Sequence, residues 1–161
     1  MLFRSVYGTP LYVRHDIVHN HSVINYFKEK GVIFIEDLEE VPHGETIIFS
    51  AHGTAPDIYK EADIKELNII DATCPLVTKV HRHAMRFSSR EVQTILIGHK
   101  GHQELVGTSG YVKPEYLSVI ENENDIDALE IDEENPIGYL TQTTLSVNDT
   151  KDIIDRKSTR L

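Results

Sequence analysis

The architecture follows from residues 46–75, TIIFSAHGTAPDIYKEADIKELNIIDATCP, in which two short apolar segments flank a longer amphipathic one. Thr46–Phe49 is rich in β-branched residues and predicts a buried strand. Ala55–Leu67 has a polar face and predicts a helix, and Leu67–Ile70 predicts the next strand. Strand, helix and strand in this order are typical of an α/β protein with a mostly parallel sheet.

The same alternation continues on both sides of this stretch. The predicted strands are Pro10–Arg14, Val32–Ile35, Val92–Ile97 and Ile137–Thr141, and the further predicted helices are His21–Lys30 and Leu76–Phe87. Ser146 and Asp149 have the spacing of a capping box, which predicts a final helix. A second strand–helix set begins after Cys74, so we expect a domain boundary near Pro75.

The two ends of the chain differ in character from the middle. Leu2–Ser5 is what CTC TTC CGA TCT encodes, and Asp155–Leu161 is what GAT CGG AAG AGC ACA CGT CTG encodes. Both strings are common sequencing adaptor, in opposite orientations. We therefore expect residues 2–5 and 156–161 to be adaptor-derived and both native termini to be absent.

Composition excludes several classes of protein. With 40% hydrophobic and 26% charged residues, the chain has the composition of a soluble globular protein. A formal net charge of −10 argues against a nucleic-acid partner, and no apolar stretch is long enough to span a membrane. One cysteine, Cys74, cannot form an internal disulfide, which favours a reducing compartment.

Polar and reactive residues gather where the predicted strands end. These tips are His19–Asn20, Ser50–Gly53, Thr73–Pro75, Gly98–Glu104 and Thr141–Thr144. Ligands of open parallel sheets bind beyond the carboxyl ends of the strands. We therefore expect the five tips to line one polar site.

The side chains at these tips suggest separate roles. Cys74 precedes Pro75, which suits the first position of a helix, and a helix N-terminus favours the thiolate that binds a soft metal. The alternative is a small buried side chain without a chemical role. His19 and His52 suit anion binding. Glu104 would serve as a proton donor if it is buried, because burial favours the neutral carboxyl group.

The remaining tip residues carry weaker signals. Thr143 offers a hydroxyl contact, and the tip glycines Gly53, Gly98 and Gly101 would let the backbone approach a ligand closely. The other histidines are interpreted as surface or helix-face residues, namely His15, His21, His43, His81 and His83.

Five segments in order closely resemble successive motifs of the hydroxymethylbutenyl diphosphate reductases, the LytB family. They are YVRHDIVHN (Tyr12–Asn20), IFSAHGTAP (Ile48–Pro56), DATCPLVTKVH (Asp71–His81), ILIGHKGHQELVGT (Ile95–Thr108) and LTQTTLSVNDT (Leu140–Thr150). The resemblance implies reductive conversion of 4-hydroxy-3-methylbut-2-enyl diphosphate to isopentenyl and dimethylallyl diphosphate, in the non-mevalonate route to isoprenoids. The implied partners are this allylic diphosphate and an electron donor such as ferredoxin or flavodoxin.

The resemblance also assigns roles to residues. Family members hold a [4Fe-4S] cluster with three cysteines, and Cys74 matches the middle one. His19 and His52 match positions that hold the diphosphate. His102 and Glu104 match the pair near the substrate hydroxyl, where the glutamate is implicated in proton delivery, and Thr143 matches a threonine beside them. His102 and Thr143 are thus expected both to bind substrate and to take part in catalysis.

This sequence departs from the family pattern in two respects. The other two cysteines do not occur in this chain, and Gln103 stands where proline is usual. The family fold has three pseudo-equivalent α/β modules. We expect residues 6–74 to form the first without its opening strand and helix, and residues 75–155 to form an incomplete second. We expect the fragment to be inactive by itself, with the bacterial cytoplasm as its home and a plastid as the alternative.

Two other functions compete with this interpretation. One is a zinc-dependent hydrolase, although the spacings match no standard zinc pattern. Its ligands would come from Cys74, His81, His83 or His99, His102 and Glu104. The other is a non-catalytic phosphate-binding module, against which the intact Cys74, His102 and Glu104 argue.

Overall fold

The computed structural model describes residues 10–15, 21–129, 135–146 and 150. His19, Asp149 of the predicted capping box and the suspected adaptor residues 2–5 and 156–161 lie outside the described residues. The chain divides into two compact units, Met1–Cys74 and Pro75–Leu161. Within the described ranges, none of the helices combines the length and the apolar character needed to cross a membrane.

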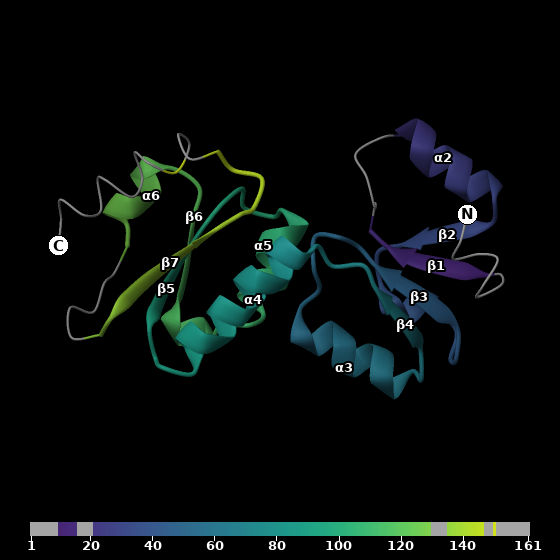
Figure 1. Cartoon of the computed structure of the whole chain (residues 1–161), viewed down its shortest axis with the longest axis horizontal. Helices are drawn as coiled ribbons and strands as arrows, with labels where there is room; N and C mark the ends of the chain where they lie inside the picture. The colour runs from purple at the N-terminus through teal and green to yellow at the C-terminus, as the bar shows by residue number, and fades with distance from the viewer. Residues whose placement is uncertain (1–9, 16–20, 130–134, 147–149, 151–161) are drawn as a thin grey trace. The chain divides into compact units, whose positions relative to one another are not determined.

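The first unit is a four-stranded parallel sheet with the strand order β2-β1-β3-β4 (Figure 1). Its elements are β1 (Leu11–Arg14), α2 (His21–Glu29), β2 (Val32–Ile35), η1 (Leu38–Glu40), β3 (Thr46–Phe49), α3 (Pro56–Ile64) and β4 (Asn68–Asp71). Every strand is only four residues long, so the sheet depends on side chains packed against both of its faces.

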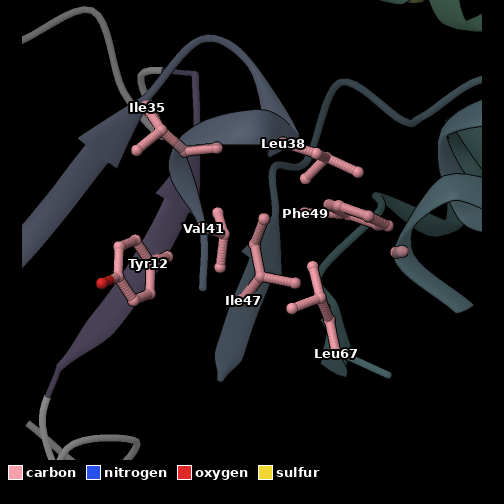
Figure 2. Close-up of a cluster of buried hydrophobic side chains, with 8 residues drawn as sticks. Tyr12, Ile35, Leu38, Val41, Ile47, Phe49 and Leu67 are labelled. Atoms are coloured by element: carbon pink, nitrogen blue, oxygen red, sulfur yellow. The ribbon is translucent and has the colours of Figure 1, made fainter. Parts of the chain in front are cut away.

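Successive side chains of each strand point to opposite faces of this sheet, and a different helix covers each face. Figure 2 shows the face that packs against α3, with Tyr12, Ile35, Ile47 and Phe49 beside Leu38, Val41 and Leu67. The other face packs against α2 through Phe27 and carries Leu11, Val13, Val32, Phe34 and Ile48. Covering both faces explains why these strands contain apolar residues almost without interruption.

The second unit repeats this plan around a three-stranded parallel sheet with the order β6-β5-β7. Its elements are α4 (Pro75–Ser88), β5 (Gln93–Ile97), α5 (Gln103–Ser109), η2 (Pro114–Tyr116), β6 (Leu117–Ile120), α6 (Glu123–Asp127) and β7 (Ile137–Thr141). Side chains of α4 and α5, including Ala84 and Leu105, pack with Leu96 and Leu140 on one face. Ile126 of α6 packs with Ile95 and Ile97 on the other face.

The predicted α/β class and parallel pairing are confirmed, whereas some element boundaries differ. The helix predicted over Ala55–Leu67 ends at Ile64, because Glu66 adopts a left-handed conformation with φ of 54°. The sequence pattern did not predict strand β6. Its first three residues are only partly buried, and only the last, Ile120, is buried. Propensity alone does not detect so short a strand without its neighbour β5.

In both sheets, the strands that follow the first strand are added on both of its sides, although all of them run in the same direction. In the first unit, β2 and β3 lie on opposite sides of β1, and in the second unit β6 and β7 lie on opposite sides of β5. The strand order therefore changes side at the first strand, and ligands of open parallel sheets bind at the carboxyl ends of the strands beside such a switch point. These switch points are located at β1/β3 and at β5/β7.

The buried faces make a stability prediction for the first unit. Ile47 of β3 is 0% exposed, whereas Ile64 at the end of α3 is 77% exposed. Ile47→Ala should lower the free energy of unfolding by about 2–5 kcal/mol, because it leaves a cavity in the α3-facing core. The matched change Ile64→Ala should alter it by less than about 0.5 kcal/mol. Urea unfolding followed by circular dichroism compares the two, and equal effects would contradict this packing.

Candidate active site

In the first unit, the loop after β3 brings Ser50 and His52 to the β1/β3 switch point. Ser50 is buried, and its Oγ lies 3.4 Å from Nδ1 of the half-buried His52. Gly53 follows with φ of +86°, a conformation that glycine adopts without strain. The loop thus reverses within a few residues and holds the imidazole at the sheet edge. The other predicted anion ligand, His19, belongs to the undescribed residues after β1.

Cys74 is held by the turn that follows β4. The Asp71 carboxylate accepts hydrogen bonds from the Thr73 backbone N–H at 2.9 Å and from the Thr73 hydroxyl at 2.5 Å. Its other oxygen accepts from the Tyr59 hydroxyl of α3 at 2.7 Å. The Cys74 N–H then donates to the Ala51 carbonyl at 3.0 Å, which ties this turn to the loop that carries His52.

Cys74 is the predicted metal ligand of this unit. The residue is half-buried and immediately precedes α4, a helix of 14 residues. Among the described residues, no group of three or more His, Cys, Asp or Glu side chains is arranged to hold a metal. Cys74 therefore does not form a metal site with its described neighbours, and its role as a metal ligand stays a prediction.

In the second unit, Glu104 and Thr143 meet at the β5/β7 switch point. Glu104 is 2% exposed although it carries a carboxyl group. One of its oxygens accepts from the Thr143 backbone N–H at 2.6 Å, and the other accepts from the Thr143 hydroxyl at 2.8 Å. These residues are 39 positions apart in sequence, so the contact exists only because β5 and β7 are neighbours. The burial that the sequence analysis required of Glu104 is present.

His102 begins the short helix that carries Glu104. Its Nδ1 accepts a hydrogen bond from the Glu104 N–H at 3.1 Å, which makes it the N-cap of α5. Because Nδ1 is the acceptor, the proton of the neutral imidazole is on Nε2. His102 can therefore donate a hydrogen bond through Nε2 without carrying a positive charge.

Gln142, next to Thr143, also joins the loop after β7 to the loop after β5. Its Oε1 accepts from the His99 backbone N–H at 3.0 Å, and its Nε2 donates to the Thr144 hydroxyl at 2.8 Å. A Cβ atom at Gly98 would lie 2.8 Å from this Oε1 and 2.5 Å from Leu105 Cδ1. Gly98 is therefore needed for close packing between protein groups, and its predicted role beside a ligand stays a prediction.

Two histidines expected at the surface have other environments. His81 of α4 is only 6% exposed and stacks on Tyr111 with ring centroids 4.3 Å apart. His15 follows β1 with φ of 60°, and its Nδ1 lies 2.8 Å from the Glu36 carboxylate. Position in a helix does not reveal which face meets the sheet, and the left-handed turn at His15 leaves no mark in sequence.

Arg14 at the end of β1 is a polar residue that the sequence analysis did not consider. Its Nε and the Nε2 of His15 are buried and have no hydrogen-bond partner among the described residues. Burial lowers the pKa of Arg14, against the opposing field of three acidic neighbours. Two successive basic residues at the end of a buried strand are the signal that would have identified this pair.

The predicted site residues thus fall into two groups. The first unit holds His52 and Cys74, linked through the Cys74 N–H and the Ala51 carbonyl. The second unit holds His102, Glu104 and Thr143, linked by the hydrogen bonds of Glu104. Each group lies at the carboxyl edge of its own parallel sheet. That all five tips form one site stays a prediction.

Comparison with known proteins gives one consistent family. The curated 4-hydroxy-3-methylbut-2-enyl diphosphate reductase of Cutibacterium acnes is 48% identical over 151 residues, covering 94% of this chain and 46% of that protein. The reductase 1 of the same name from Rhodopseudomonas palustris is 52% identical over 148 residues, with 92% and 48% covered. The chain therefore spans about half the length of the curated relatives it matches.

Solved structures agree with the sequence comparison. The E-1-hydroxy-2-methyl-but-2-enyl-4-diphosphate reductase from Plasmodium falciparum superimposes with a TM-score of 0.94 at 41% identity, over 99% of this chain and 50% of that one. A structure of (E)-4-hydroxy-3-methyl-but-2-enyl diphosphate reductase gives 0.80 at 29% identity, over 98% and 56%. The family described as LytB protein matches residues 3–161. The resemblance carried by the five sequence motifs is confirmed, and the chain belongs to the LytB family.

Proposed function

We propose that this chain forms two modules of a reductase that converts 4-hydroxy-3-methylbut-2-enyl diphosphate to isopentenyl and dimethylallyl diphosphate. The observation that carries the proposal is the buried Glu104 carboxyl group bound to Thr143 at a sheet switch point, in a chain of this family. Residues 6–74 would be the first module and residues 75–155 the second, each incomplete. Because the chain spans about half of its relatives, the complete reaction requires further segments.

The reaction needs two electrons and two protons. The allylic C–O bond breaks, one proton joins the departing oxygen to give water, and the second proton joins the carbon skeleton. Glu104 is the residue placed to deliver a proton, because its carboxyl group is buried beside Thr143 at the carboxyl edge of the sheet. The Thr143 N–H can only donate, so it fixes one oxygen of Glu104 as an acceptor.

The second oxygen of Glu104 contacts the Thr143 hydroxyl, which can either donate or accept a hydrogen bond. A hydroxyl donates to a carboxylate and accepts from a carboxylic acid, so this contact can persist in both protonation states. A proton carried by Glu104 would therefore be on the oxygen that contacts the Thr143 hydroxyl, and not on the oxygen that accepts from the Thr143 N–H. His102 would donate from Nε2 to the substrate, with its tautomer fixed by the cap on α5. These roles explain why the two residues are expected both to bind substrate and to assist catalysis.

The diphosphate would be bound by imidazoles of the first unit. His52 is held through Nδ1 by Ser50 at the β1/β3 switch point, and His19 follows β1 at the same edge in sequence. Histidines donate to phosphate oxygens, and the left-handed Gly53 keeps the loop short beside them. The anion would therefore lie at the carboxyl edge of the first sheet.

Cys74 would supply one of three thiolates to a [4Fe-4S] cluster, with the other two cysteines outside this chain. When bound, the cluster supplies the two electrons one at a time. Asp71, through Thr73, fixes the turn from which the thiolate extends. The electrons would come from a donor such as ferredoxin or flavodoxin. We place the protein in the bacterial cytoplasm, with a plastid as the alternative.

A zinc-dependent hydrolase gains no support from the described residues. His81 is buried against Tyr111 while His83, two residues along α4, is exposed, so the two imidazoles point in different directions. Within the described ranges, no three His, Cys, Asp or Glu side chains come together in a way that could hold a metal ion. A phosphate-binding module without catalysis would not require the buried Glu104–Thr143 pair.

The first test is to read the source DNA outward from codons 7 and 150. We expect the reading frame to continue upstream into a glycine-rich segment with a cysteine, and downstream into a further cysteine. Three cysteines in one frame would provide the ligand set for the cluster. A frame that ends where this chain ends would remove the catalytic proposal and leave a one-cysteine relative.

The second test concerns cluster binding by the chain itself. With Cys74 as its single cysteine, the chain should not retain a cluster after anaerobic reconstitution and desalting. Iron and sulfide analysis with absorbance spectroscopy should show less than one cluster per ten chains, whereas the longer protein should retain nearly one. A stable, fully loaded cluster on this chain would contradict the ligand assignment.

The third test separates proton delivery from binding in the longer protein. Glu104→Gln should lower kcat by about 10²–10⁴-fold, because the amide cannot deliver a proton, while the affinity for the diphosphate substrate is retained. The matched control is Glu115→Gln, since Glu115 is exposed in the same unit. Steady-state kinetics and calorimetric titration measure the two quantities. Unchanged turnover in Glu104→Gln would remove this residue from the mechanism.

A further inference from the structure

One helix carries an unusual concentration of positive charge for an acidic chain. The chain contains 26 Asp and Glu residues against 16 Lys and Arg residues. Between Pro75 and Arg90, however, there are Lys79, Arg82, Arg86 and Arg90 but no Asp or Glu. The positive charge is therefore segregated onto α4 and the turn after it.

Three of these residues share one face of the helix, and the fourth follows it. Their spacing of three or four residues places Lys79, Arg82 and Arg86 on the same side of α4, and Arg90 lies in the turn after the helix ends at Ser88. All four are exposed, whereas Val77, His81, Ala84 and Ser88 on the opposite side are buried. Within the part of the chain that the structure describes, none of the four forms an ion pair. We call Lys79, Arg82, Arg86 and Arg90 the basic face of α4.

We propose that the basic face of α4 docks the acidic surface of a small one-electron carrier protein. The proposal rests on the proposed function, because a reductase requires a partner that supplies electrons. An acidic protein complements the basic face in charge. The rest of the chain is rich in carboxylates that would repel this partner elsewhere, so the basic face also fixes where it docks.

The position of the basic face favours an electron carrier over other acidic partners. Helix α4 begins directly after Cys74, the proposed cluster ligand. Lys79 is five residues along the chain from Cys74, which corresponds to about 7.5 Å of helical rise. The Lys79 end of the basic face is therefore the end nearest the proposed cluster ligand, and a protein docked there could transfer an electron over a short distance.

The surface also has the character of a transient interface. Leu76 is 62% exposed and lies one helical turn before Lys79 on the same side, so it provides an apolar contact at the end nearest Cys74. The remaining contacts are exposed charges, which raise the rate of encounter more than they hold a complex together. A carrier that must dock, transfer one electron and leave requires this kind of surface.

Binding of this chain to an oxidised ferredoxin of strongly negative net charge tests the proposal without any turnover. Calorimetric titration at low ionic strength should detect a complex with the unmodified chain. Arg82→Glu/Arg86→Glu should weaken it by about tenfold or more, and salt near 0.5 M should have a similar effect through screening. Lys30→Glu/Lys60→Glu is the matched control, since it makes the same charge change at exposed sites of the first unit and should leave binding unchanged. Circular dichroism verifies that all variants are folded.

Activity of the longer protein gives the second readout. Arg82→Glu/Arg86→Glu should lower turnover with reduced ferredoxin but retain turnover with reduced methyl viologen, a cationic dye without an acidic surface. No complex with the unmodified chain, or equal binding by the variants, would overturn the proposal. So would self-association or nucleic-acid binding through the same arginines. If the unmodified longer protein shows no turnover with either donor, the proposed reductase function is refuted. The binding measurement with the ferredoxin would still be interpreted separately.

Discussion

Parallel pairing of the strands is the constraint on which the other features of this protein depend. Every strand pair in both sheets is parallel, so each connection must return to the same end of the sheet. The returning helices cover both faces, which allows strands of four or five residues to be buried on both sides. All carboxyl ends of one sheet consequently meet at one edge, and the functional residues follow those ends.

The two units apply this constraint in the same way with different chemistry. In each, the strands on either side of the first strand create a switch point, and a hydrogen-bonded carboxyl group supports a loop at the carboxyl edge of the sheet. In the first unit, Asp71 binds Tyr59 and Thr73 and thereby fixes the turn before Cys74. In the second unit, Glu104 binds Thr143, and Gln142 ties the same two loops together by accepting a hydrogen bond from the His99 N–H. One unit presents a thiol and imidazole, and the other presents a carboxyl group and imidazole.

Burial decides which of these polar groups are suited to chemistry. The carboxylate of Asp71 belongs to an exposed turn and organises backbone, whereas Glu104 is removed from water and has Thr143 as its donor. The exposed carboxylate is surrounded by water, whereas the buried one can present its oxygen only to a group that enters the site. The exposed charges of α4 have a third use, since charges in water act at long range on an approaching partner.

Sequence alone determined the α/β class, most strand positions and the family, because apolar periodicity and motif order are properties of the chain itself. It also placed the reactive residues after strands. Only the tertiary structure decided that Glu104 meets Thr143, that Gly98 is required by Leu105 and Gln142, and that His81 is buried. It also revealed β6, which the sequence pattern did not detect. These features arise from contacts between segments far apart in sequence, and no local pattern encodes which loops will become neighbours when the strands pair.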